Sequence, residues 1–177
     1  MKIAITNNEL TKKQAFKLTL FTSYIAYVIF GCVLVLFMYF RSPAMFSTGE
    51  TKALLGIPLA ILLGPLFNAI TISISCTFLL LIVKQFSIAQ LSPIQSNKYS
   101  AKNYFYFTGI GVFILCAIMF WPMALFGQAP TQPTWFLVAM LLMPFINGIL
   151  NGAALCGAVA LLQKFNLLSF TYANQAP

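Results

Sequence analysis

Four long apolar runs alternate with shorter polar segments along the chain. They cover residues 18–40, 54–83, 104–126 and 135–162. About 20 residues of helix span the hydrocarbon core of a bilayer, so each run is long enough to cross it. The pattern therefore predicts an all-α integral membrane protein, in which residues 1–177 form a single membrane domain with four transmembrane helices.

Polar residues at the ends of the runs set the expected helix boundaries. Ser47 and Glu50 have the spacing of a capping box, in which each side chain bonds a backbone N–H at the start of a helix. Thr6 and Glu9 repeat this spacing before the first run. The predicted helices cover residues 18–40, 48–84, 104–126 and 135–164.

The second and fourth helices carry similar sequences, 79 positions apart. The matching pairs are Pro65 and Pro144, Asn68 and Asn147, Ala69 and Gly148, Ile70 and Ile149, and Phe86 and Phe165. The first and third helices match more weakly. We therefore expect two tandem helical hairpins, with repeat one at 18–86, a linker at 87–103, repeat two at 104–165 and a polar tail at 166–177. Each unit crosses the membrane twice, so both copies keep the same orientation and form a parallel internal repeat.

Small side chains recur at every fourth position of these two helices. They are Ala69, Ser73 and Thr77 in the second helix, and Gly148, Gly152, Cys156 and Ala160 in the fourth. Small residues let membrane helices approach closely, so this stripe is expected to pack within the molecule, with a homo-oligomer contact as the alternative. Pro58, Pro65 and Pro144 are expected to kink their helices, because proline removes a backbone hydrogen bond.

Composition and charge agree with a membrane protein and orient it. Of the residues, 60% are hydrophobic and only 7% are charged, whereas about 25% are charged in soluble domains. Eight lysines fall on one predicted side of the membrane: Lys2, Lys12, Lys13, Lys17, Lys84, Lys98, Lys102 and Lys164. Only Arg41 and Lys52 fall on the other side.

This charge distribution predicts that both termini are cytoplasmic, because basic residues concentrate on the cytoplasmic side of membrane proteins. We expect a bacterial inner (cytoplasmic) membrane, with lysines that meet anionic lipid headgroups at the cytoplasmic face. The lipid bilayer accounts for the basic excess, so no nucleic-acid partner is expected.

The sequence offers little chemistry for catalysis. It contains no histidine and no aspartate, and both glutamates are assigned to helix starts. The four cysteines occur one per helix without a Cys-x-x-Cys pair. Metal sites, acid–base pairs and hydrolytic triads need residues that are absent. We therefore expect no catalytic residue, no metal, no cofactor and no enzymatic activity.

Asn68, Asn147 and Asn151 are the candidate site residues. They are interpreted either as interhelical hydrogen-bonding groups or as a polar site near the proline kinks. The first interpretation favours a structural or interaction subunit that binds another membrane protein. The second favours a permeation or transport unit for a small solute, lined by the asparagines of the second and fourth helices, either alone or as an oligomer.

Overall fold

The computed structural model describes residues 2–5, 10–41, 51–86, 88, 92–95, 98–126 and 133–172. This part of the chain contains four long helices: α1 (Lys12–Arg41), α3 (Thr51–Gln85), α4 (Ala101–Phe126) and α5 (Thr134–Lys164). The four predicted helices are thereby confirmed. Each is long and apolar enough to cross a membrane, which indicates an integral membrane protein.

Helix α1 begins earlier than the apolar run predicts, because a capping box precedes it. The Thr11 backbone N–H donates a hydrogen bond to Gln14 Oε1 at 2.8 Å. The Gln14 backbone N–H donates to the Thr11 hydroxyl oxygen at 3.3 Å. This reciprocal pair starts the helix at Lys12. The boxes predicted at Thr6 with Glu9 and at Ser47 with Glu50 lie outside the described residues.

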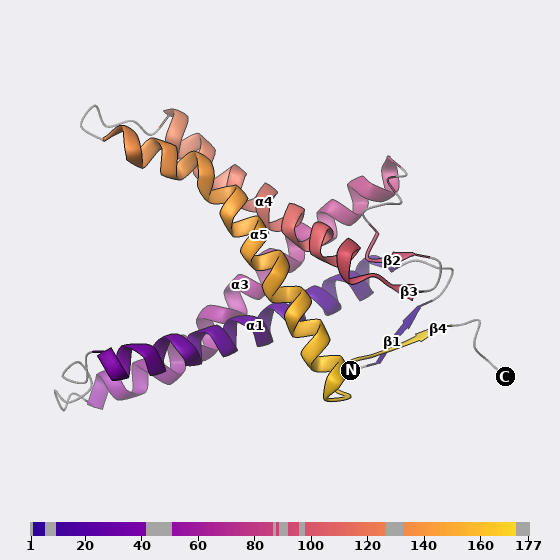
Figure 1. Ribbon diagram of the computed structural model, residues 1–177, viewed down its shortest axis with the longest axis horizontal. Helices are drawn as coiled ribbons and strands as arrows, with labels where there is room; N and C mark the ends of the chain where they lie inside the picture. The colour runs from indigo at the N-terminus through magenta and orange to yellow at the C-terminus, as the bar shows by residue number, and fades with distance from the viewer. Residues whose placement is uncertain are drawn as a thin grey trace.

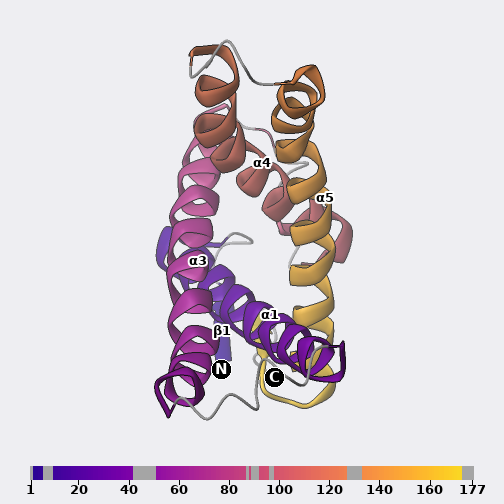
Figure 2. The same cartoon turned by 90° about the vertical axis from the view of Figure 1, so that its left-hand side faces the viewer.

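Consecutive helices pack as pairs, α1 along α3 and α4 along α5. The two pairs cross, and the C-terminal ends of α1 and α4 lie well apart in both views (Figures 1 and 2). The short strands lie at the opposite end of the pairs (Figure 1). Since α1 and α4 start at the strand end, the two pairs diverge toward the other end.

Polar contacts join the pairs near their crossing. The Thr22 hydroxyl of α1 and the Tyr104 hydroxyl of α4 lie 2.8 Å apart and are buried. The Ser75 hydroxyl of α3 donates to the Gly111 carbonyl of α4 at 2.6 Å. In a bilayer such hydrogen bonds stabilise the contact between helices, because no water competes for the hydroxyl groups.

A small folded cap covers the strand end of the helices. Strand β1 (Lys2–Ile5) pairs in parallel with β4 (Ser169–Tyr172), and β2 (Ile94–Gln95) pairs antiparallel with β3 (Lys98–Tyr99). The cap buries four aliphatic side chains, Ile3, Leu10, Ile94 and Leu168. The aromatic ring of Phe170 stacks on that of Tyr99, with centroids 5.1 Å apart. The segment expected as a polar tail thus contributes a strand and apolar contacts.

Candidate functional site

Asn151 of α5 joins two helices from different pairs. The hydroxyl of Tyr27 in α1 donates a hydrogen bond to the side-chain oxygen of Asn151. The Asn151 amide nitrogen donates to the backbone carbonyl of Asn147 at 2.8 Å. Both groups of the Asn151 amide are therefore used, and the side chain is held between α1 and its own helix.

A cavity of about 360 Å³ lies beside this contact, between α1 and α5. Tyr27, Asn147 and Asn151 supply its polar groups, and the remaining lining side chains are apolar. The Asn147 amide nitrogen is 3.9 Å from the sulfur of Met143, a weak acceptor. The cavity therefore offers a small polar patch in an apolar wall, which suits a small neutral molecule better than an ion.

Asn68 does not join the other two asparagines. It lies about halfway along the 35 residues of α3, is exposed, and does not line the cavity. Its amide makes no hydrogen bond to any residue that the structure describes. The structure thus brings Asn147 and Asn151 together and leaves Asn68 on the surface of α3.

The surroundings of Asn68 are open as well as polar. Gly64 precedes it by one turn and has no atom within 4 Å of the position where a Cβ would stand. Thr71 follows it on the same side of the helix and is exposed, with its hydroxyl donating to the Phe67 carbonyl at 2.8 Å. We call the surface formed by Gly64, Asn68 and Thr71 the Asn68 face.

The Asn68 face points toward the side of α3 that meets α4. Ser75 lies seven residues after Asn68, hence about two turns further along the same side of the helix. Its hydroxyl contacts Gly111 of α4. From this contact toward the N-terminal half of α3, the two helices diverge (Figure 1), and Asn68 precedes Ser75 by seven residues in that direction.

The glycines of α5 pack against α4. A Cβ added at Gly148 would lie 2.8 Å from the Gly109 carbonyl oxygen, and one at Gly152 would lie 3.0 Å from the Phe105 carbonyl oxygen. The Cys156 thiol donates to the Ala101 carbonyl at 3.3 Å. These contacts bring the backbones of α4 and α5 closer together than side chains would permit.

The other predicted residues are distributed as follows. In α3, Ala69 and Ser73 are buried and Thr77 is partly buried, whereas Ala160 in α5 is exposed. Pro65 and Pro144 are buried in helices that continue through them. Pro58 lies within α3, and its side chain is outside the described residues.

Among the described residues, no group of three or more histidine, cysteine, aspartate or glutamate side chains could hold a metal ion. The cysteines in this part of the chain are all free thiols. The polar groups of the cavity between α1 and α5 and of the Asn68 face are amides and hydroxyls.

Sequence reasoning does not single out Tyr27, whose hydroxyl donates to Asn151. The depth of Tyr27 within the first apolar run indicates that its hydroxyl needs a partner in the protein. Residue 27 lies nine positions inside the run, which corresponds to about 14 Å at 1.5 Å per residue. A tyrosine at that depth needs a partner for its hydroxyl, because none is supplied by lipid chains.

Comparison with known proteins gives no assignment. No family model matches this chain, and no curated protein or solved structure shows significant similarity to it. The functional conclusion therefore depends on the chain's own residues and their arrangement.

Proposed function

We propose that this protein is a non-enzymatic interaction subunit that binds another membrane protein through the Asn68 face. The observation that carries this proposal is the exposed Asn68 amide in the middle of a membrane-spanning helix. Transfer of an amide into hydrocarbon without a hydrogen-bond partner costs roughly 2–7 kcal/mol. A helix of another membrane protein that bonds the amide would remove this cost.

The residues around Asn68 suit a close helix contact. Gly64 leaves the α3 backbone accessible, and Thr71 adds a hydroxyl one turn beyond Asn68. A small residue and a polar residue four positions apart are typical of helix–helix interfaces in membranes. The divergence of α3 from α4 leaves this side of α3 uncovered within the described part of the chain (Figure 1).

The proposal includes two tandem hairpins related by a parallel internal repeat. The burial of side chains supports the repeat, because several residues at matched positions of α3 and α5 are buried in both helices. The matched pairs that are buried in both helices are Pro65 and Pro144, Ala69 and Gly148, Ser73 and Gly152, Cys76 and Leu155, Leu79 and Ala158, Leu80 and Val159, and Val83 and Leu162. Asn147, the counterpart of Asn68, lies beside the cavity at α1. The repeat therefore gives two equivalent amides, of which Asn68 is the one left for a partner.

The proposal also includes a bacterial inner membrane and cytoplasmic termini. Its support is the lysine distribution, with eight basic residues at or near the strand end of the helices and two at the opposite end. Basic residues are favoured on the cytoplasmic side and attract anionic headgroups. The cap formed by β1, β2, β3 and β4 would then lie in the cytoplasm.

A permeation or transport unit is the second candidate function, and the cavity between α1 and α5 favours it. Its Tyr27, Asn147 and Asn151 side chains could bind a small neutral solute. Its weakness is that Asn68 is not part of the lining, so the polar groups do not extend along two equivalent helices.

Copurification from native membranes tests the interaction proposal. A tagged chain extracted in mild detergent should retain a stoichiometric second membrane protein. The Asn68→Leu and Gly64→Leu variants should lose it, because one removes the amide and the other fills the open space above the α3 backbone. The matched control is Asn147→Leu, which changes the same side chain at the equivalent position and should retain the partner.

A different result would favour the second function. If the wild-type chain purifies alone, as a monomer or a homo-oligomer, the interaction proposal is wrong. Solute flux in liposomes that falls in Asn147→Leu and persists in Asn68→Leu would then support permeation through the cavity between α1 and α5.

A further inference from the structure

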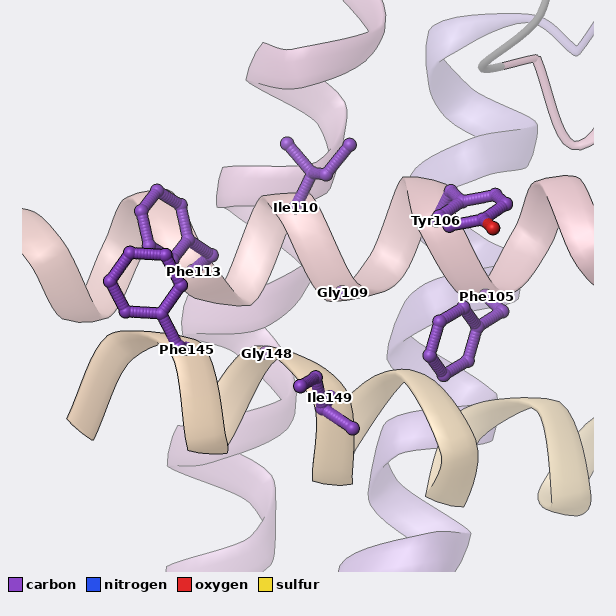
Figure 3. A pocket seen from close by; sticks show the side chains of 8 residues that line it. All are labelled: Phe105, Tyr106, Gly109, Ile110, Phe113, Phe145, Gly148 and Ile149. Carbon is purple, nitrogen blue, oxygen red and sulfur yellow. The ribbon is translucent and has the colours of Figure 1, made fainter. Parts of the chain in front are cut away.

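A groove on the surface of α4 and α5 is lined by side chains of these two helices alone (Figure 3). Its volume is about 270 Å³ and its wall is almost entirely apolar. Phe113 and Phe145 close one end, with ring centroids 4.8 Å apart. Phe105 and Tyr106 stand at the other end (Figure 3). Aromatic side chains therefore bound the groove at both ends.

The floor of the groove exists because glycines face each other there. Gly109 and Gly148 have no side chains to fill the space, and a Cβ at Gly148 would lie 2.8 Å from the Gly109 carbonyl oxygen. The larger side chains that line the groove therefore project further from the helices than these two glycines do. A second apolar cavity, of about 390 Å³, shares Phe113 with the first and extends along α4 to Trp121 and beyond. This second cavity lies beyond Phe113, so the groove between Phe105 and Phe113, called the channel below, is the part nearest the start of α4.

A positive charge stands at the strand end of this channel. Lys102 is exposed and precedes Tyr106 by four residues, so the two side chains lie on the same side of α4. The described part of the chain contains no acidic residue, and hence nothing there that could form an ion pair with Lys102. Lys102 is also next to the start of α4, beside the polar cap, at the level where lipid headgroups are expected.

We propose that this channel binds one acyl chain of an anionic phospholipid, with the lipid phosphate at Lys102. The apolar wall of the groove suits the acyl chain, and the positive charge of Lys102 attracts the negatively charged phosphate. The Tyr106 hydroxyl can donate a further hydrogen bond to the phosphate or ester oxygens. The site uses α4 and α5 and not the Asn68 face, so it stands independently of the proposed partner.

Quenching of Trp121 fluorescence by a brominated lipid tests this proposal. The Trp121 ring contacts Phe113, with centroids 5.7 Å apart, so an acyl chain that reaches Phe113 in the channel ends close to the Trp121 ring. The full-length protein, with Trp135→Phe to leave a single tryptophan, is reconstituted in phosphatidylcholine vesicles that contain a minor fraction of phosphatidylglycerol brominated on its acyl chains. The same vesicles with brominated phosphatidylcholine give the level for random mixing.

The brominated anionic lipid should be enriched beside Trp121 by about fivefold over the zwitterionic lipid, the preference that one lysine at the surface supplies. Lys102→Gln should reduce quenching to the level of random mixing, whereas Lys164→Gln, at the same end of α5, should leave it unchanged. Ile149→Phe, which fills the groove from an exposed position, should also reduce it. Equal quenching by the two lipids, or equal losses in Lys102→Gln and Lys164→Gln, would overturn the proposal.

Discussion

The hydroxyl of Tyr27 in α1 donates a hydrogen bond to the side-chain oxygen of Asn151 in α5. These residues are 124 positions apart and belong to different helix pairs. Their contact links the two pairs beside the cavity at α1 and α5. A hydrogen bond between membrane helices is worth about 0.6 kcal/mol on average and at most about 1.7 kcal/mol.

Tyr27→Phe should therefore lower the free energy of unfolding by about 0.6–1.7 kcal/mol, since it removes the hydroxyl and leaves the Asn151 oxygen unpaired. Reversible unfolding in mixed micelles measures this change. Tyr24→Phe is the control, because Tyr24 is partly buried on the same helix and has no hydrogen bond in the described part of the chain. Equal losses of stability in Tyr27→Phe and Tyr24→Phe would show that the hydrogen bond between Tyr27 and Asn151 does not stabilise the fold.

Gly152→Leu should destabilise the protein far more than Cys156→Ser. A side chain at position 152 meets the Phe105 carbonyl oxygen at 3.0 Å and the Phe105 ring at 3.1 Å. Forced overpacking costs typically about 1–3 kcal/mol. A serine at 156 keeps a donor for the Ala101 carbonyl. Thermal stability in detergent measures both, and the reverse order would contradict the assignment of the face of α5 that packs on α4.

Asn68→Leu and Asn151→Leu should have different effects on the stability of the isolated protein. Asn151 holds two hydrogen bonds, so its replacement removes them and destabilises the fold by about 1 kcal/mol. Asn68 holds none among the described residues, so Leu should leave stability unchanged or raise it slightly. Unfolding in detergent micelles tests the difference. A loss in Asn68→Leu as large as that in Asn151→Leu would show that Asn68 has a partner within the chain.

The cap should weaken at alkaline pH through Tyr99. Burial raises the pKa of the Tyr99 phenol above its ordinary value of 10.0. Above that pH the unfolded chain has lost the phenol proton that the folded chain still binds, so the stability falls as pH rises. One such group contributes at most about 1.4 kcal/mol per pH unit. Tyr99→Phe should reduce this loss, as measured by unfolding below and above pH 10. If the stability of Tyr99→Phe falls with pH as steeply as that of the wild type, Tyr99 is not the cause of the alkaline loss.

The helices could be predicted from the sequence because lipid imposes a minimum apolar length on each span. The predicted ends differ from the observed ends mainly at the strand end, where α1 begins at Lys12 and α4 at Ala101. These starts depend on local side chains: Thr11 pairs with Gln14, and the Ser100 hydroxyl oxygen accepts a hydrogen bond from the Asn103 N–H. Such polar turns lie outside the hydrophobic pattern.

The cap could not be predicted, because its strands are short and distant in sequence. Lys2 pairs with Ser169 across nearly the whole chain, and neither segment alternates for long enough to indicate a strand. The asparagines could be predicted as candidates because they place amides near the prolines of two apolar helices. Their separation into a bonded pair and an exposed amide depends on how the helix pairs cross, which composition and periodicity do not determine.

The central claim is that the Asn68 face binds another membrane protein, and photo-crosslinking in native membranes tests it most directly. A photoreactive amino acid is placed either at Thr71, on this face, or at Leu66, which is exposed on the opposite side of α3. The proposal predicts one discrete adduct with a second membrane protein from position 71 and none from position 66. Adducts with lipid alone at both positions, or the same protein adduct from both, would contradict it.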